Sequence, residues 1–356
     1  MSDTMNRLIQ YKITAYQASI RDFLKEQGYP RGILTALKNT PHTVRRNNQD
    51  ALLRQELWPN DVLDILIEDL ESSQNITAMP MPISIIYEDE DILVVDKPAG
   101  VPIHPSINHH ADTLANGLMA YYRAQGLPFV FRCMNRLDRD TSGLTLLAKN
   151  PLSAALLSAQ VKSKQLQRTY LCIATQDTGN IPMGCTQCLD MIHTPIEHPE
   201  DLNTMEAAIA PLEGLGTINA SIGRLEGSTI ERCIDWEHGK SAITHYQVLP
   251  SLTDSMLPVP IREQLSVPLN QLNIKNGFSL VSLQLETGRT HQIRVHMRHI
   301  GHPLPGDFLY NPDMTEIKRQ ALHSYQLDFI HPITHAAMTL QAPLPADMLA
   351  FYGLTD

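Results

Sequence analysis

Hydrophobic residues recur along the chain with two different periods, which predict a mixture of helices and strands. An interval of three to four residues predicts helices at residues 12–27, 32–39, 152–161 and 290–300. Short apolar runs and alternating patterns predict strands within residues 57–67, 85–86, 92–95, 144–148, 169–174, 241–249 and 278–286. Because strands and helices do not alternate regularly, the pattern indicates an α+β fold rather than a doubly wound parallel sheet.

A change in composition predicts two domains joined by a linker. Residues 71–82 are polar and then rich in methionine and proline, which is typical of a linker. The helix–helix–strand order of residues 1–70 predicts a small N-terminal α/β domain, for which a merely stabilising extension is the alternative. Residues 83–349 predict a larger second domain, because a chain of 356 residues is long enough for both.

Charge is distributed unevenly along the chain. The formal net charge of −10 is unfavourable for binding a nucleic acid. Residues 177–237 hold eleven acidic side chains and only two arginines, so the remaining chain is close to neutral. Residues 130–170 and 20–54 carry net charges of +5 and +4. We therefore expect an acidic insertion at about 177–237 that points away from any bound polyanion.

Several features predict a cytoplasmic protein with reduced thiols and no membrane partner. The polar N-terminus lacks a signal-peptide core, and no apolar run approaches the roughly 20 residues that cross a bilayer. The five cysteines, an odd number, argue against a disulfide framework. We expect the protein to be a monomer.

The segment Asn135–Leu144 concentrates charged residues directly before an apolar run. It holds two arginines and two carboxylates, and it predicts an exposed loop that enters a buried strand. A carboxylate such as Asp138 could act there as a nucleophile or general base. It could equally form a structural ion pair with an arginine, and the spacing alone favours this alternative.

Asp138 also lies in a motif with a known counterpart. The sequence from Arg136 to Leu144 resembles the catalytic motif of the RluA-type family of pseudouridine synthases. Further segments match in the order typical of the family, so that the resemblance covers residues 83–349. These segments are Tyr87–Gly100 with His104-Pro105, Arg168–Leu171, Thr287–His296 with Gly301–Pro303 and Gly306-Asp307, Ala321–His323, and Phe329–Pro332.

The resemblance implies both a fold and an activity. The fold is a mixed, mostly antiparallel sheet bent around a central cleft, with flanking helices. The activity is the isomerisation of specific uridines to pseudouridine in structured ribosomal or transfer RNA. Neither a redox step nor a group transfer to another molecule occurs, so no cofactor and no nucleotide cofactor are expected. The target base must leave its stack to be reached.

Three catalytic residues follow from the resemblance. Asp138 supplies the essential carboxylate, which either attacks the ribose or assists departure of the base, while Asp140 is expected at the surface. Tyr170 supplies a flat surface under the base, and its phenol could move a proton; without the motif, we would interpret it as a core aromatic. Arg294 is the expected partner of Asp138 and would hold the carboxylate in its charged form. The alternative for Arg294 is a solvated charge on a helix.

A second set of residues is expected to contact the RNA. Arg136 would displace the base or bind a phosphate, and Arg168 stands where the family usually has lysine. Lys97 and His104 would line the entry, although Lys97 could simply fix the end of a strand. The helix start at Arg289 could meet a phosphate, and Leu322 could form an apolar wall.

Two departures from family patterns concern loops. Asn135 stands where the family often has histidine, which we interpret as a change in loop hydrogen bonding. The N-terminal domain resembles the small RNA-binding domain of the ribosomal-protein-S-four type. Its usual Asn-Gly turn is replaced by Asn47-Asn48.

Metal sites are weaker candidates. Cys185, Cys188, His193 and His198 have the ligand types and spacing of a structural zinc knuckle, with exposed thiols as the alternative. His291, His296 and His299 are expected on a helix surface or facing RNA rather than on a metal.

Two other functional classes compete with the isomerase. One is a catalytically inactive RNA-binding or ribosome-assembly module. The other is a metal-dependent nuclease or deaminase, which would need a ligand set beside the carboxylate.

Overall fold

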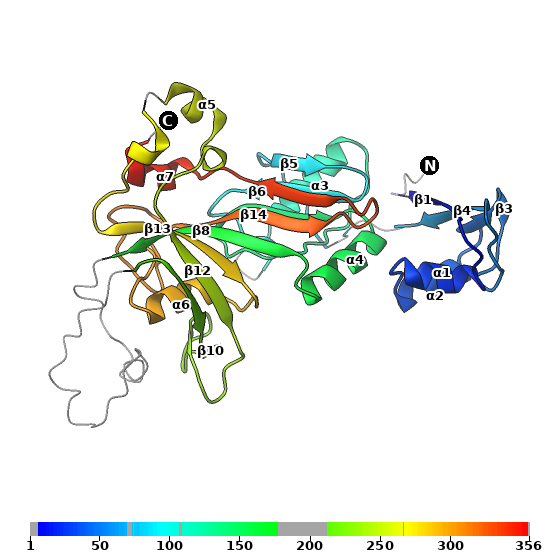
Figure 1. Cartoon of the computed structure of the whole chain (residues 1–356), viewed down its shortest axis with the longest axis horizontal. Helices are drawn as coiled ribbons and strands as arrows, with labels where there is room; N and C mark the ends of the chain where they lie inside the picture. Colours follow the sequence, from blue (N-terminus) through cyan, green and yellow to red (C-terminus); the bar gives the residue numbers. More distant parts are fainter. Residues whose placement is uncertain are drawn as a thin grey trace.

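The computed structural model describes residues 6–69, 73, 75–106, 109–176, 212–265 and 267–354. A small N-terminal sheet lies at one end of the long axis, and a much larger sheet forms the centre of the molecule (Figure 1). Within the described residues, no helix is long and apolar enough to cross a membrane. The α+β class predicted from the hydrophobic pattern is confirmed.

The N-terminal domain, described from residue 6 to 69, is a four-stranded antiparallel sheet packed against two helices. Its strand order is β1-β4-β2-β3, and apolar residues of both helices and three of the strands form one hydrophobic core. Its elements are β1 (Arg7–Lys12), α1 (Ile20–Glu26), α2 (Arg31–Asn39), β2 (Val44–Arg46), β3 (Gln49–Asp50) and β4 (Val62–Ile67).

The predicted helix at residues 12–27 is wrong in its first half. The chain runs as a strand up to Lys12, and the helix begins only at Ile20. The start is fixed by Ser19, whose hydroxyl accepts a hydrogen bond of 3.0 Å from the backbone N–H of Asp22. The predicted second helix is confirmed as α2, and the strand after the turn at residues 59–61 is confirmed as β4.

The turn at Asn47-Asn48 replaces the usual Asn-Gly pair without loss of the hairpin. Both residues adopt left-handed backbone angles, with φ of 51° and 64°, and they join β2 to β3 by a two-residue loop. Asparagine tolerates this conformation better than most other residues. Asn47 also binds Asp61 through a side-chain hydrogen bond of 2.7 Å.

The large sheet has nine strands, all paired antiparallel except for the parallel pair β7–β14. The strand order is β5-β6-β7-β14-β8-β13-β12-β9, and β15 pairs with β14. The strands are β5 (Ser84–Glu88), β6 (Ile92–Lys97), β7 (Ser142–Ala148), β8 (Gln167–Thr175), β9 (Leu215–Asn219), β12 (Ile243–Leu249), β13 (Phe278–Leu285), β14 (Leu322–Ile330) and β15 (Ala337–Gln341).

Helices and a separate hairpin complete the larger part. The hairpin consists of β10 (Ile222–Arg224) and β11 (Arg232–Ile234). The α-helices are α3 (Leu114–Ala124), α4 (Pro151–Lys162), α5 (Val259–Gln264), α6 (Gln292–His299) and α7 (Ala346–Leu349). Short 3-10 helices span Asp254–Met256, Leu269–Gln271 and Ala350–Tyr352.

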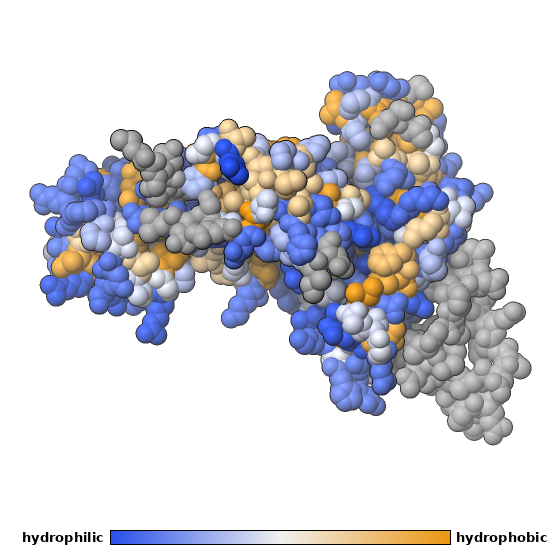
Figure 2. All heavy atoms as spheres, turned by 180° about the vertical axis from the view of Figure 1, so that it is seen from behind, coloured by the Kyte–Doolittle hydropathy of each residue, from blue (hydrophilic) through white to orange (hydrophobic). Residues whose placement is uncertain are grey.

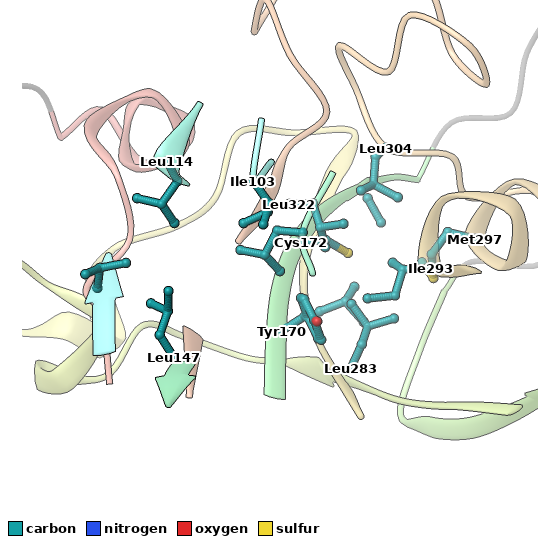
Figure 3. Packing of buried hydrophobic residues seen from close by; sticks show 14 of the residues in the cluster. Ile103, Leu114, Leu147, Tyr170, Cys172, Leu283, Ile293, Met297, Leu304 and Leu322 are labelled. Carbon is teal, nitrogen blue, oxygen red and sulfur yellow. The ribbon is translucent and has the colours of Figure 1, made fainter. Parts of the chain in front are cut away.

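The central strand β7 shows how the sheet is buried on both faces. All seven of its residues are buried. Leu147 belongs to the core that includes α3, whereas Leu144 and Leu146 belong to the core on the other side with α4. The two cores cover opposite faces because successive side chains of a strand point to opposite sides. Figure 3 shows the first core, where Tyr170 packs among residues from several elements.

Part of the predicted acidic insertion, strand β9, belongs to the large sheet. Residues 177–211 lie outside the described part of the chain. Within the remainder of the predicted insertion, β9 pairs antiparallel with β12 and forms an edge of the large sheet. This part of the segment is therefore integrated into the fold.

The N-terminal domain is fixed to the larger part by specific contacts. Leu152 of α4 is fully buried within the N-terminal core. The Arg7 guanidinium donates two hydrogen bonds of 2.9 Å to the buried carboxylate of Asp91. Arg132 donates two further bonds, of 2.7 and 2.8 Å, to Asp69. Bidentate pairs of this kind constrain orientation as well as distance.

Candidate active site

Asp138 lies in a tight loop that leads into the buried strand β7. The backbone N–H of Thr141 donates to the carbonyl of Asp138 at 3.2 Å. Upstream, the buried amide of Asn135 donates to the Leu144 carbonyl at 2.9 Å and accepts from the Leu146 N–H at 2.7 Å. The Asn135 side chain thus ties the start of the loop to the strand that follows it. The Asp138 side chain stays 29% exposed, so it can be reached from solvent.

Arg294 of α6 reaches Asp138 from 156 positions further along the chain. Its terminal nitrogen Nη1 donates to Asp138 Oδ2 at 3.0 Å, while Nε and Nη2 each donate to Asp307 at 2.7 Å. The Arg294 side chain is only 2% exposed, so the alternative of a solvated helix charge is excluded. Burial opposes its charge, but the carboxylates of Asp307 and Asp138 outweigh this effect and raise the pKa of Arg294.

His291 lies next to the same carboxylate, and Tyr310 lies next to His291 and Arg294. His291 Nε2 lies 3.9 Å from Asp138 Oδ2, and its Nδ1 lies 2.9 Å from the hydroxyl of Tyr310. Burial lowers the pKa of His291, Asp138 opposes this shift, and Arg294 adds to it. The Tyr310 ring lies under the Arg294 guanidinium, with 5.0 Å from its centre to the guanidinium carbon.

Tyr170 lies on β8 and is only 4% exposed. Its ring packs in the core beside Leu283, Ile293 and Leu322 (Figure 3). Burial raises the pKa of its phenol, and the nearby cation of Arg168 opposes this shift. The residue therefore has the apolar surroundings of a core aromatic and also lies within electrostatic range of Asp138.

Lys97 does not line the entry, and this expectation is wrong. Its side chain is fully buried, and its ammonium donates to the backbone carbonyls of Pro98, Val101 and Arg139 at 2.8 to 2.9 Å. Burial lowers its pKa to about 7. The contacts agree with the alternative that Lys97 fixes the end of a strand, because they tie the end of β6 to the Asp138 loop.

Asp140 is less exposed than predicted and is paired with its neighbour. It accepts two hydrogen bonds, of 2.9 and 2.8 Å, from the Arg139 guanidinium, and its side chain is 15% exposed. Its carbonyl also accepts a bond of 3.3 Å from Arg319, which is itself paired with Asp347. Both carboxylates of the loop are thus in ion pairs, Asp140 with its neighbour Arg139 and Asp138 with the distant Arg294.

The other predicted contact residues differ in exposure. Arg136 and His104 are exposed, and the His104 ring packs against Phe131 at 5.7 Å between centres. Arg168 is half-buried, and Arg289 donates to the Ser241 carbonyl at 3.0 Å. These side chains remain candidates for phosphate contacts.

The three histidines near α6 do not share a role. His296 is fully buried, with contacts of 2.9 Å to Thr244 Oγ1 and the Ala220 carbonyl, so its predicted place on a helix surface is wrong. His299 is half-buried. Only His291 lies next to Asp138 among the three, because it precedes α6 in a left-handed conformation with φ of 58°.

Comparison with known proteins identifies the family. The model for the RNA pseudouridylate synthase family matches residues 91–299. The chain is 33% identical to the uncharacterized RNA pseudouridine synthase YjbO of Bacillus subtilis, over 93% of this chain and 96% of that protein. It is 30% identical to the ribosomal large subunit pseudouridine synthase D of Nitrosomonas europaea, over 84% of this chain and 73% of that protein. The chain belongs to the RNA pseudouridine synthases of the RluA type.

As a pseudouridine synthase, the protein is an isomerase that acts on RNA. Its site contains residues whose roles the motif analysis missed. Asp307 lay inside a matched segment but received no role, because nothing local indicates that it fixes Arg294. The glycine directly before it, Gly306, is a sequence signal of a special turn and could have drawn attention to it. In the structure, the φ of Gly306 is 71°, and a side chain there would clash with the Arg319 carbonyl.

The predicted zinc residues, Cys185, Cys188, His193 and His198, lie outside the described residues of this pseudouridine synthase. Within the described part, Asp89, Asp91 and His331 form a group with the spacing of metal ligands. Their polar atoms are used by protein partners. Asp91 accepts from Arg7, and Asp89 contacts His331 Nε2 at 2.8 Å and accepts from Tyr87 at 2.9 Å. The group therefore has a structural role, because its members bind other side chains of the protein.

Proposed function

We propose that this pseudouridine synthase modifies specific uridines of structured ribosomal RNA, with Asp138 as the catalytic carboxylate. The observation that carries the proposal is the contact of 3.0 Å between Asp138 and Arg294. The guanidinium is fixed in turn by two bonds of 2.7 Å to the fully buried Asp307. A carboxylate that is fixed, charged and still partly exposed fits the requirements of a nucleophile.

The reaction joins the same ribose carbon, C1′, to a different atom of the same base. The bond between the uracil nitrogen N1 and ribose C1′ breaks, the base turns, and a bond forms between C5 and C1′. The proton on C5 is then lost, and N1 gains one, so that atoms and electrons balance without a cofactor. Asp138 serves either by attacking C1′ or by stabilising the positive ribose as the base departs.

Tyr170 and Leu322 would form the floor beneath the everted base. Both are nearly buried and belong to the same hydrophobic core. Because burial raises the pKa of Tyr170, the phenol retains its proton at neutral pH, and a flat apolar contact is its main contribution. Movement of the C5 proton by this phenol would require prior loss of its own proton.

Arginines would position the RNA around this site. Arg136, Arg168 and Arg289 come from three separate segments, and they offer donors for phosphate oxygens. Ribosomal RNA is favoured over transfer RNA as the substrate because relatives such as the Nitrosomonas europaea protein are named for the large ribosomal subunit. The uridine would lie in a loop that can be opened.

The division into domains supports this arrangement. We propose an N-terminal RNA-binding domain at residues 1–70, a linker at 71–82 and a catalytic domain at 83–349. Separate sheets support the division, because no strand of the described residues is shared between the two. The hydrophobic cores are also largely separate, although Leu152, Leu156 and Ile333 of the larger part pack against the N-terminal core.

The test is to incubate purified protein with ribosomal RNA that lacks pseudouridine, and to map the product by position. Asp138→Asn removes the charge while it preserves the shape, and it should abolish the product. Asp140→Asn is the matched control, since it changes a carboxylate two positions away that is paired with Arg139. Product from Asp138→Asn at the normal rate would refute the assignment. Absence of product with the unaltered protein on both ribosomal and transfer RNA would favour the inactive binding module.

A further inference from the structure

Two half-exposed aromatic rings lie in contact on the N-terminal domain. The centres of the Tyr16 and Trp58 rings are 4.9 Å apart, and the rings are tilted by 57°. Tyr16 is 48% exposed and Trp58 is 54% exposed. Single exposed apolar residues are common on protein surfaces and need no explanation. A contacting aromatic pair with both rings open to solvent is a different feature, because it offers adjoining aromatic faces on which a flat group can stack.

The two rings are held in position by the backbone beneath them. Residues Gln17 and Leu57, next to the rings, form an isolated antiparallel bridge with backbone hydrogen bonds of 2.9 and 3.0 Å. The backbone N–H of Trp58 donates to Asp61 at 2.8 Å, and the Tyr16 phenol lies close to the Glu56 carboxylate. The pair is thus pre-organised, and a ligand that binds it pays little to order it.

The charges around the pair favour contact with a base rather than with a phosphate. Glu56 and Asp61 are both acidic. Arg46 is the nearby cation, and it donates to the Glu56 carbonyl at 2.9 Å and lies 3.9 Å from Asp61. Asp61 is already occupied by Trp58, Asn47 and Arg46, and the bond from the Trp58 backbone is the largest of the effects that lower its pKa. A neutral, flat group suits this surface better than an anion does.

We propose that Tyr16 and Trp58 form a stacking platform for an unpaired base of the substrate RNA. Every nucleobase has a π-face, and stacking on aromatic side chains is a general mode of binding single-stranded RNA. The occupant is RNA because the chain belongs to a family that acts on RNA. This inference depends on that family membership and is independent of the role of Asp138.

The position of the domain determines what the platform does. The N-terminal domain lies at one end of the molecule, beyond α4, whereas α6 with Arg294 lies towards the other end (Figure 1). The contacts through Arg7 and Asp91 fix the domain in that place. The platform would therefore bind RNA at a distance from the target uridine. It should contribute to affinity for long RNA and leave the chemical step unchanged.

Fluorescence offers a direct test, because the chain contains only two tryptophans. Trp236→Phe leaves Trp58 as the only tryptophan. In this background, with Asp138→Asn added to prevent turnover, a single-stranded RNA of roughly 12 nucleotides should quench Trp58 emission. The same sequence in a duplex should quench it much less, since its bases are already stacked. Equal quenching by both forms, or quenching by neither, would overturn the proposal.

Binding of a long ribosomal RNA fragment tests the energetic contribution. Trp58→Ala should weaken binding about 5- to 150-fold, the range for loss of one stacked base, whereas Trp58→Phe should keep most of the affinity. Leu52→Ala is the matched control, because Leu52 is 56% exposed in the same domain but has no ring. The dependence of affinity on salt should not change in Trp58→Ala, because no phosphate contact is lost.

The rate of isomerisation separates this proposal from the catalytic one. In single turnover at saturating RNA, Trp58→Ala in the otherwise unaltered protein should react at the normal rate. Melting curves of each variant establish that it is folded. Unchanged affinity in folded Trp58→Ala would refute the platform, even if Asp138 proves catalytic. Quenching of Trp58 emission by a ribosomal protein but not by RNA would also overturn the proposal, in favour of a protein contact.

Discussion

Replacing Arg294 by lysine tests whether the geometry of the guanidinium matters beyond its charge. Arg294 uses three nitrogens on two carboxylates, one on Asp138 and two on Asp307. A lysine ammonium is a single point charge and cannot reproduce this forked contact. In Arg294→Lys the positive charge remains, but either Asp138 or Asp307 loses its partner.

The expected loss of rate follows from one hydrogen bond. A hydrogen bond to a charged group contributes about 1.5–3 kcal/mol. If the lysine stays with the fully buried Asp307, where an unpaired charge costs most, the bond to Asp138 is lost. At about 1.4 kcal/mol for each factor of ten, the rate of the chemical step should fall roughly 10- to 150-fold. Loss of one bond to Asp307 should also lower the free energy of unfolding by about 1.5–3 kcal/mol.

The assay is a single-turnover measurement of pseudouridine formation with saturating RNA, corrected for the folded fraction. Arg298→Lys is the matched control, because Arg298 lies on the same helix and has its guanidinium carbon 6.0 Å from the centre of the Tyr310 ring. A folded Arg294→Lys protein with the normal rate would refute the reasoning. Equal losses in both variants would show that α6 is generally sensitive to substitution.

Three further predictions concern stability, pH and metals. Arg7→Ala should lower the free energy of unfolding by about 1.5–3 kcal/mol, measured by urea denaturation, because Asp91 loses two hydrogen bonds. The exposed Lys12→Ala is the control, and a midpoint of Arg7→Ala equal to that of the control would argue against a fixed domain. Burial lowers the pKa of His323 to about 4, so the unfolded chain binds its proton first as pH falls from about 6.5. The free energy of unfolding should therefore decrease on acidification, by roughly 2 kcal/mol at pH 5 from this group alone. His323→Gln should lose less of this free energy between pH 7 and pH 5 than the unaltered protein, and an identical loss in both proteins would contradict the reasoning. EDTA should leave the rate of isomerisation unchanged, because the chemistry of Asp138 and Arg294 needs no metal, and inactivation by EDTA would contradict the proposed mechanism. Analysis of the zinc content of Cys185→Ser tests the predicted zinc knuckle separately.

Local patterns in the sequence determined much of the secondary structure. The helical spacing in residues 152–161 corresponds to α4, and the apolar run at residues 144–148 corresponds to β7. These patterns are informative because burial of one face, or of both, sets the period of the side chains. β1 was missed because only one of the six residues of its short segment Arg7–Lys12 is buried, so the segment offers little apolar signal.

The sequence identified Asp138 through a motif, but only the tertiary structure decided its surroundings. Arg294 reaches it from a helix 156 positions away and is itself fixed by Asp307 of the following loop. The same folding buries Lys97, which was expected at the entry. A sequence specifies which groups are present and the local shape of the chain. Which charge is buried, and which partner it meets, depends on contacts between distant segments, and these exist only once the sheet has formed.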